Sequence, residues 1–196
     1  MVRFEVSRRT FLALPVSGVF LGELETFLGK AASGIRGVKW VNASSVHITL
    51  HFFGKTEEAE IETIGEVMRE IAAQTPPLKL SLQEIGFFPD QRNPRVIWLD
   101  VGGEVKQLKG LQAVLEGRLQ EAHFASEKRD FRAHATVGRT RRGASLGDEI
   151  KKLVFPATEE RVLDQMILFE SLLESGGPVY RPLLSFSLEG PQKIRS

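Results

Sequence analysis

The sequence predicts an α+β fold built from two copies of a β-α-β-α-β unit, whose antiparallel sheets face each other across a pseudo-two-fold cleft. Some short stretches alternate apolar and polar residues, which is typical of half-buried strands. Other stretches repeat apolar residues every three or four positions, which is typical of amphipathic helices. A His-x-Thr motif in a strand-like stretch occurs at residue 47 and again at residue 134, 87 residues later.

The first half is expected to hold three strands and two helices. The strands are predicted at about 9–15, 45–53 and 78–88, and the helices at about 17–33 and 57–74. Thr56 is a candidate N-cap of the second helix, because acidic residues follow it directly. Pro89 is expected to end the third strand.

The second half is expected to repeat this order and to end with one further strand. Strands are predicted at about 95–101, 131–139, 161–172 and 180–188, a long helix at about 105–122, and a short helix at about 145–153. A shift of 87 residues places Phe11-Leu12 on Trp98-Leu99 and Leu80–Leu82 on Ile167–Phe169. We therefore expect one bilobal domain over 1–196, with approximate halves 1–90 and 91–196.

Composition indicates an ordinary globular protein of 196 residues, with 42% apolar and 26% charged residues. The chain has no Cys, which excludes disulfides and thiolate metal sites. No stretch has the ~18 apolar residues of a membrane span, and the N-terminus lacks a signal-peptide pattern. We expect a cytoplasmic monomer that does not bind membranes.

The net charge is only +1, but basic residues gather around the second motif. They are Lys128, Arg129, Arg132, Arg139, Arg141 and Arg142. A local basic rim of this kind suits a phosphate-bearing substrate. An ordinary solvated surface is the alternative for any single member.

The two motifs read His47-Ile48-Thr49-Leu50 and His134-Ala135-Thr136-Val137. Strand alternation places each His and Thr on one face and the apolar residues on the other. Two such strands together would present two imidazoles and two hydroxyls, which is equipment for metal-free acid–base chemistry on a phosphate. The alternative is two ordinary strand histidines.

The motifs resemble those of the two-histidine phosphoesterase superfamily, and within it the RNA 2′,3′-cyclic phosphodiesterase family, whose bacterial members are also called 2′-5′ RNA ligases. The resemblance covers nearly the whole chain. The segments that carry it are 9–14, 38–41, 46–54, 131–139, 169–172 and 177–180. The chain departs from the common pattern at Ala133, where the family commonly has proline.

The resemblance implies metal-independent hydrolysis of RNA 2′,3′-cyclic phosphate ends to 2′-phosphates, without a cofactor. It implies His47 as the proton donor to the leaving 3′-oxygen and His134 as the base that activates water. Thr49 and Thr136 would donate hydrogen bonds to phosphate oxygens. The same site with a ribose 5′-hydroxyl in place of water would form a 2′-5′ linkage. A phosphodiesterase for small cyclic nucleotides and a non-catalytic RNA-binding module are the alternatives.

Four further residues are candidate substrate contacts. Arg139 follows from the resemblance, although strict alternation puts it on the face opposite His134, so a bulge or strand end is required. His51 shares the predicted face of Thr49 and could border the cleft, with a structural histidine as the alternative. Phe11 could stack a terminal base or belong to the core, and Tyr180 could approach the cleft.

Overall fold

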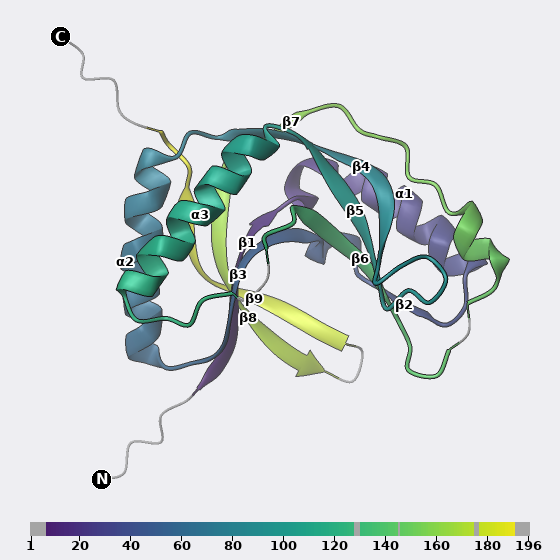
Figure 1. The fold of residues 1–196 in the computed structure, drawn as a ribbon, viewed down its shortest axis with the longest axis horizontal. Helices are drawn as coiled ribbons and strands as arrows, with labels where there is room; N and C mark the ends of the chain where they lie inside the picture. The colour runs from purple at the N-terminus through teal and green to yellow at the C-terminus, as the bar shows by residue number, and fades with distance from the viewer. Residues whose placement is uncertain (1–6, 128–129, 145, 175–176, 191–196) are drawn as a thin grey trace.

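The computed structural model describes residues 7–127, 130–144, 146–174 and 177–190. Its elements follow each other in one chain order (Figure 1). They are β1 (Arg8–Pro15), α1 (Ser17–Gly34), β2 (Val38–Trp40), η1 (Ala43–Ser45), β3 (His47–Thr56), α2 (Glu58–Gln74), β4 (Leu78–Phe88), β5 (Val96–Gly103), α3 (Val105–Glu121), β6 (His134–Thr140), η2 (Asp148–Lys152), β7 (Arg161–Leu163), β8 (Gln165–Glu174) and β9 (Gly177–Ser187). The α+β class is confirmed.

The three long helices lie where periodicity predicts them, and the differences concern short elements. Strand β2 and the 3₁₀ helix η1 were not predicted. The predicted short helix is the five-residue 3₁₀ helix η2, and residue 145, its expected start, lies outside the described residues. The strand predicted at 161–172 is interrupted at Asp164, which separates β7 from β8.

The prediction of Thr56 as the N-cap of α2 is wrong. Thr56 is the buried last residue of β3, and its Oγ1 lies 2.6 Å from Oγ1 of Thr10 on β1. The cap is Glu57, whose backbone N–H donates to the Glu60 carboxylate at 2.7 Å. A carboxylate three residues into the helix therefore satisfies a free amide at its start.

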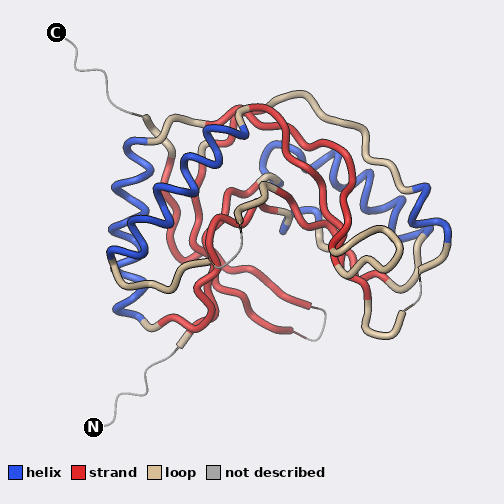
Figure 2. The backbone as a smooth tube through the Cα atoms, in the orientation of Figure 1, coloured by secondary structure: helices blue, strands red, loops and turns tan. Residues whose placement is uncertain are grey.

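The strands form one sheet in the order β7-β4-β5-β6-β3-β1-β8-β9, and β2 also pairs with β6. The third long strand of each half lies in the other half's part of the sheet. Strand β4 of the first half pairs with β5, and strand β8 of the second half pairs with β1. The two parts meet where β3 pairs with β6, and the sheet curls around this junction (Figure 2). The motif strands are therefore central neighbours.

The spacing of 87 holds for the motif strands but not for the strands beside them. Ala13 lies opposite Thr49, and Trp98 lies opposite Thr136. Ala13 therefore corresponds to Trp98, so the predicted match of Phe11 with Trp98 is wrong by two residues. Ile167 pairs with Ala13, and Gly86 pairs with Trp98, so the match of Leu80–Leu82 with Ile167–Phe169 is also wrong. The connections in the two halves differ in length, which changes the offset from strand to strand.

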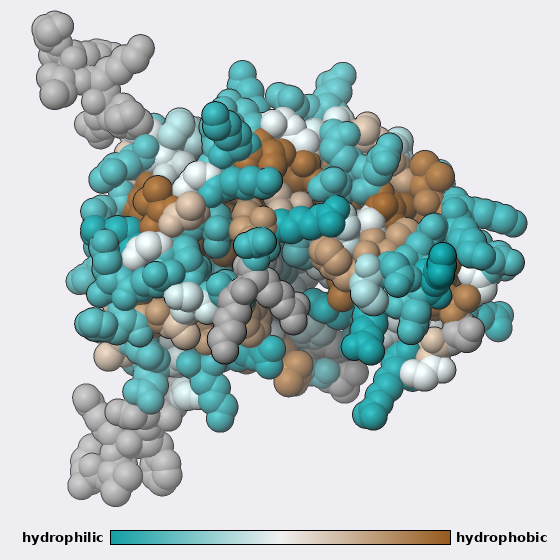
Figure 3. All heavy atoms as spheres, in the orientation of Figure 1, coloured by the Kyte–Doolittle hydropathy of each residue, from teal (hydrophilic) through white to brown (hydrophobic). Residues whose placement is uncertain are grey.

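The helices cover the sheet and leave its inner side to the motif residues. Helices α2 and α3 pack together at one end of the molecule, whereas α1 lies at the other end near β2 and β7 (Figure 1). Helix α1 buries Phe20, Leu24 and Phe27. Hydrophilic residues cover most of the visible face, with smaller apolar patches between them (Figure 3). Among the described residues, no helix has the length and apolarity needed to cross a membrane.

Candidate active site

The four motif side chains share one face at the β3–β6 junction. Ile48 lies opposite Ala135, and both side chains are fully buried. Because side chains alternate along a strand, the residues on either side of this pair point to the other face. These residues are His47, Thr49, His134 and Thr136, all half-buried. Antiparallel pairing sets His47 across from Thr136 and Thr49 across from His134.

Two pockets adjoin this face. One, of about 590 Å³, is lined by His47, Thr49, Thr136 and Arg139. The other, of about 770 Å³, is lined by Thr49, His51 and His134 among others. Since Thr49 borders both pockets, the motif residues lie between them. Diagonal neighbours across an antiparallel pair are about 7–8 Å apart, a separation that suits one phosphate held between the two imidazoles.

The same backbone contact orients both imidazoles. Nδ1 of His47 lies 2.8 Å from the Ser45 carbonyl, and Nδ1 of His134 lies 2.7 Å from the Arg132 carbonyl. A carbonyl only accepts hydrogen bonds, so Nδ1 carries the proton in both rings. Neither Nε2 has a hydrogen-bond partner among the described residues. Each Nε2 is therefore available to accept a proton, or to donate one when the ring is charged.

The surroundings of both rings disfavour their charged forms. Burial lowers the pKa of His47 to about 4, the Ser45 carbonyl opposes this shift, and the charges of His134 and Arg139 add to it. Burial also lowers the pKa of His134, with the Arg132 carbonyl and the Asp100 carboxylate opposing it. Both rings are consequently neutral at pH 7 in the free protein.

A β-bulge brings Arg139 to the motif face. Along β5, Trp98 pairs with Thr136 but Ile97 pairs with Gly138, which leaves Val137 as an extra residue. Arg139 then pairs with Val96, on the same face as Thr136. The bulge that the resemblance required is therefore present. Arg139 lines the pocket that contains His47 and Thr136.

The first motif strand carries a matching bulge at Leu50, which removes His51 from this face. Ala13 pairs with Thr49, but Leu12 pairs with His51. His51 therefore points to the side of the sheet opposite Thr49, where it is 2% exposed and its Nδ1 lies 2.9 Å from the Glu116 carboxylate of α3. His51 nevertheless lines the pocket of about 770 Å³ together with Thr49 and His134, so its role as a substrate contact stays a prediction. The two bulged residues are 87 positions apart, so the bulge belongs to the repeat.

Aromatic side chains surround the imidazole of His47. The Phe11 ring lies 4.7 Å from it and the Tyr180 ring 5.2 Å, centroid to centroid. Phe11 is only 2% exposed and also stacks on Phe169. Of the two roles left open for Phe11, the structure supports the core residue and not the base-stacking contact, because this ring is buried beside His47. Tyr180 is half-buried and lines the pocket beside His47, so it stays a candidate contact.

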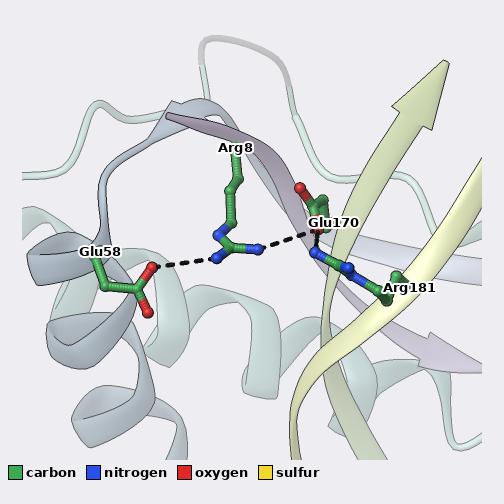
Figure 4. Close-up of polar contacts among 4 residues, drawn as sticks. All are labelled: Arg8, Glu58, Glu170 and Arg181. Atoms are coloured by element: carbon green, nitrogen blue, oxygen red, sulfur yellow. Dashed lines mark hydrogen bonds and ion pairs between the residues drawn. The ribbon is translucent and has the colours of Figure 1, made fainter. Parts of the chain in front are cut away.

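An ionic cluster ties the β8–β9 hairpin to the strand that carries Phe11 (Figure 4). The buried Glu170 carboxylate accepts hydrogen bonds from Arg8 at 3.5 Å and from Arg181. Arg8 also pairs with Glu58 of α2 at 3.5 Å. Glu170 and Arg181 adjoin Phe169 and Tyr180 in sequence, so the cluster helps hold the aromatic group in place.

Residues that the sequence analysis did not select surround His134. The Trp98 ring lies 5.9 Å from the imidazole, and the Phe88 ring lies 5.4 Å from it. The Arg132 guanidinium stacks over Trp98 at 4.2 Å. Asp100 pairs directly with His134 across β5 and β6. The alternation of Val96, Trp98 and Asp100 in the sequence predicts that their side chains share one face of β5. The pairing of β5 with β6 identifies this face as the one that carries the motif residues.

Lys128 and Arg129, part of the predicted basic rim, lie outside the described residues. The remaining members, Arg132, Arg139, Arg141 and Arg142, are exposed. Within the described ranges, no three His, Cys, Asp or Glu side chains are grouped closely enough to hold a metal ion.

In sequence, the chain is similar to proteins named RNA 2′,3′-cyclic phosphodiesterase. The chain is 34% identical to the RNA 2′,3′-cyclic phosphodiesterase of Archaeoglobus fulgidus over 179 residues, which cover 91% of this chain and 99% of that protein. It is 29% identical to the RNA 2′,3′-cyclic phosphodiesterase of Thermotoga maritima over 93% of this chain and 96% of that protein.

Solved structures share the fold. TT0787 of Thermus thermophilus superposes with a TM-score of 0.77 at 25% identity, over 94% of this chain and all of that one. LigT of E. coli complexed with 3′-AMP has a TM-score of 0.73 at 20% identity, over 93% and 99% of the two chains. A sequence model of the 2′-5′ RNA ligase superfamily matches residues 23–167. The chain therefore belongs to the 2′-5′ RNA ligase superfamily.

Proposed function

We propose that this protein is an RNA 2′,3′-cyclic phosphodiesterase that opens cyclic phosphate ends to 2′-phosphates. The observation that carries the proposal is the matched pair of imidazoles, His47 and His134, each with Nδ1 bound to a carbonyl and Nε2 free on one sheet face. Relatives of similar length are named for this activity.

In the proposed reaction, Nε2 of His134 takes a proton from water as the water oxygen bonds to phosphorus. The bond from phosphorus to the 3′-oxygen breaks, and Nε2 of His47 gives its proton to that oxygen. The products are a 2′-phosphate and a 3′-hydroxyl. Each such proton transfer is typically worth ~10²–10⁴ in rate.

The other groups at the junction would stabilise charge on the phosphate. Thr49 and Thr136 would donate hydrogen bonds to its nonbridging oxygens, and Arg139 would add a charge-assisted contact. His47 is neutral in the free protein, so it needs a proton before it acts as the acid. The anionic substrate would favour this protonation, because an opposite charge nearby raises the pKa of an imidazole.

The same groups would catalyse 2′-5′ ligation if a ribose 5′-hydroxyl replaced water as the nucleophile that attacks the cyclic phosphate, and if the bond to the 3′-oxygen broke as before. His134 would then accept the proton of the 5′-hydroxyl, and His47 would donate a proton to the 3′-oxygen. An RNA substrate is part of this proposal. A monomeric state and a cytoplasmic location stay predictions from the sequence.

The test is hydrolysis of a short oligonucleotide that ends in a 2′,3′-cyclic phosphate, with EDTA present. The parent protein should form the 2′-phosphate, and His47→Ala and His134→Ala should each lose most of the activity. His123→Asn is a matched control, because His123 is an exposed residue with positive φ, a conformation that Asn tolerates. No product from the parent protein, or full activity in either alanine variant, would overturn the proposal.

A further inference from the structure

We propose that the RNA chain leading to the cyclic end crosses the ribbon formed by β2 and the end of β6, where Lys39, Arg36 and Arg141 bind its phosphates. The preferred substrate is then an oligonucleotide, not a mononucleotide. The inference rests on the proposed function and specifies the substrate of the same site.

Strand β2 replaces β3 beside β6 as β6 leaves the junction. Ile48 of β3 pairs with Ala135, whereas Lys39 of β2 pairs with Arg139. Directly paired residues point to the same face, with Cβ atoms about 5 Å apart. Lys39 therefore joins Arg139 on the face that carries the motif residues.

Lys39 connects two neighbouring pockets. It lines the pocket of about 590 Å³ that contains His47 and Thr136. It also lines a pocket of about 560 Å³ that contains Arg36 and Arg141. A chain held at the motif residues could leave through the first pocket, pass Lys39 and enter the second.

The backbone holds these three cations on a fixed frame. The N–H of Arg141 donates to the Gly37 carbonyl at 2.8 Å, and the N–H of Val41 donates to the Val137 carbonyl at 2.9 Å. Gly37 has a φ of 81°, which turns the chain between Arg36 and the strand. Lys39 is thus presented by paired backbone, Arg141 is bonded to Gly37, and Arg36 stands directly before this turn.

Their charges are available to an anion. Arg36, Lys39 and Arg141 are exposed, and none forms an ion pair within the described residues. The cations that do form ion pairs there lie elsewhere and are Arg8, Arg118, Lys151, Arg161 and Arg181. One carboxylate, Glu174, lines the first pocket together with Val179 and Tyr180.

The spacing fits a polyanion better than one phosphate. Arg36, Lys39 and Arg141 line one pocket of about 560 Å³, and Lys39 also lines the pocket that contains the motif residues. Cations spread over two adjoining pockets suit successive phosphates of a single strand more than the oxygens of one group. A row of cations along a groove is the usual way to hold a single-stranded backbone without reading its bases.

The experiment compares adenosine 2′,3′-cyclic phosphate with a pentanucleotide that ends in the same group. We measure kcat/KM for the parent protein, for Arg36→Gln/Arg141→Gln, and for the control Lys106→Gln/Lys109→Gln. The control removes the same charge from exposed positions on α3. The parent should prefer the pentanucleotide about tenfold or more at low salt, chiefly through a lower KM.

The Arg36/Arg141 double variant should lose about tenfold in the ratio of the two kcat/KM values, and the control should keep the parent's ratio. For the pentanucleotide, the slope of log kcat/KM against log salt should become shallower by about 0.7 for each cation that no longer binds a phosphate. Equal kcat/KM values for both substrates in the parent, or an equal loss in the control, would overturn the inference alone. No hydrolysis of either substrate by the parent would overturn the proposed function and this inference with it.

Discussion

His47 should be neutral in the free protein and gain its proton together with the anionic substrate. Its pKa of about 4 means that about one molecule in a thousand carries the proton at pH 7. A phosphate between the two imidazoles would place a negative charge beside the ring and raise this pKa. Binding at pH 7 should therefore take up as much as one proton at His47. It should also make kcat/KM fall with rising pH above the pKa values of the two free imidazoles, both of which lie below 6.5, while kcat stays constant to higher pH.

Two measurements check this prediction. An NMR titration of the imidazole resonances compares the free protein with its complex with a nucleoside 2′-phosphate, and the His47→Gln variant assigns the signal among only four histidines. Calorimetry in buffers with different ionisation enthalpies counts the protons taken up. A His47 signal that titrates at or above pH 6.5 in the free protein would refute the reasoning, as would binding without proton uptake at pH 7.

Three other predictions follow from single residues. Replacing Arg139 with Gln should lower kcat/KM by about 100-fold, because the phosphate would lose this charge-assisted hydrogen bond. A shifted melting temperature would indicate instead that this exposed side chain supports the fold. Gly86→Ala should destabilise the protein by about 1–3 kcal/mol in urea unfolding, since the new Cβ would lie 2.0 Å from a ring atom of Trp98; unchanged stability would contradict the packing. Between pH 6.5 and 4, the free energy of unfolding should fall more steeply in the parent than in His47→Gln. In this range the unfolded chain binds a proton at His47, whereas the folded chain binds it only near pH 4. Identical pH profiles of the two proteins would exclude this linkage.

Local pattern was sufficient to predict the long elements and the four motif residues. The apolar stripe of α1, with Phe20, Leu24 and Phe27, depends only on residues within the same helix. The alternation around Ile48 and Ala135 likewise predicts which motif side chains share a face, because the residues concerned are adjacent in sequence.

The candidate contacts beyond the motifs depended on pairing between distant strands. Phe11 is buried because Phe169 and Tyr180 arrive beside it from the C-terminal hairpin. The position of Lys39 became visible only when β2, a three-residue strand, was found beside Arg139. Short strands of this kind have too little sequence to show a period.

The sequence by itself determined the helices, the main strands and the chemistry of the His-x-Thr pair, since each is encoded in neighbouring residues. Only the tertiary structure decided the directions of Arg139 and His51 and the exchange of β4 and β8 between the halves. The physical reason is that one extra residue at a bulge sends every following side chain to the opposite face. Which strands pair depends on contacts between residues far apart in the sequence. A local period in the sequence does not show these contacts.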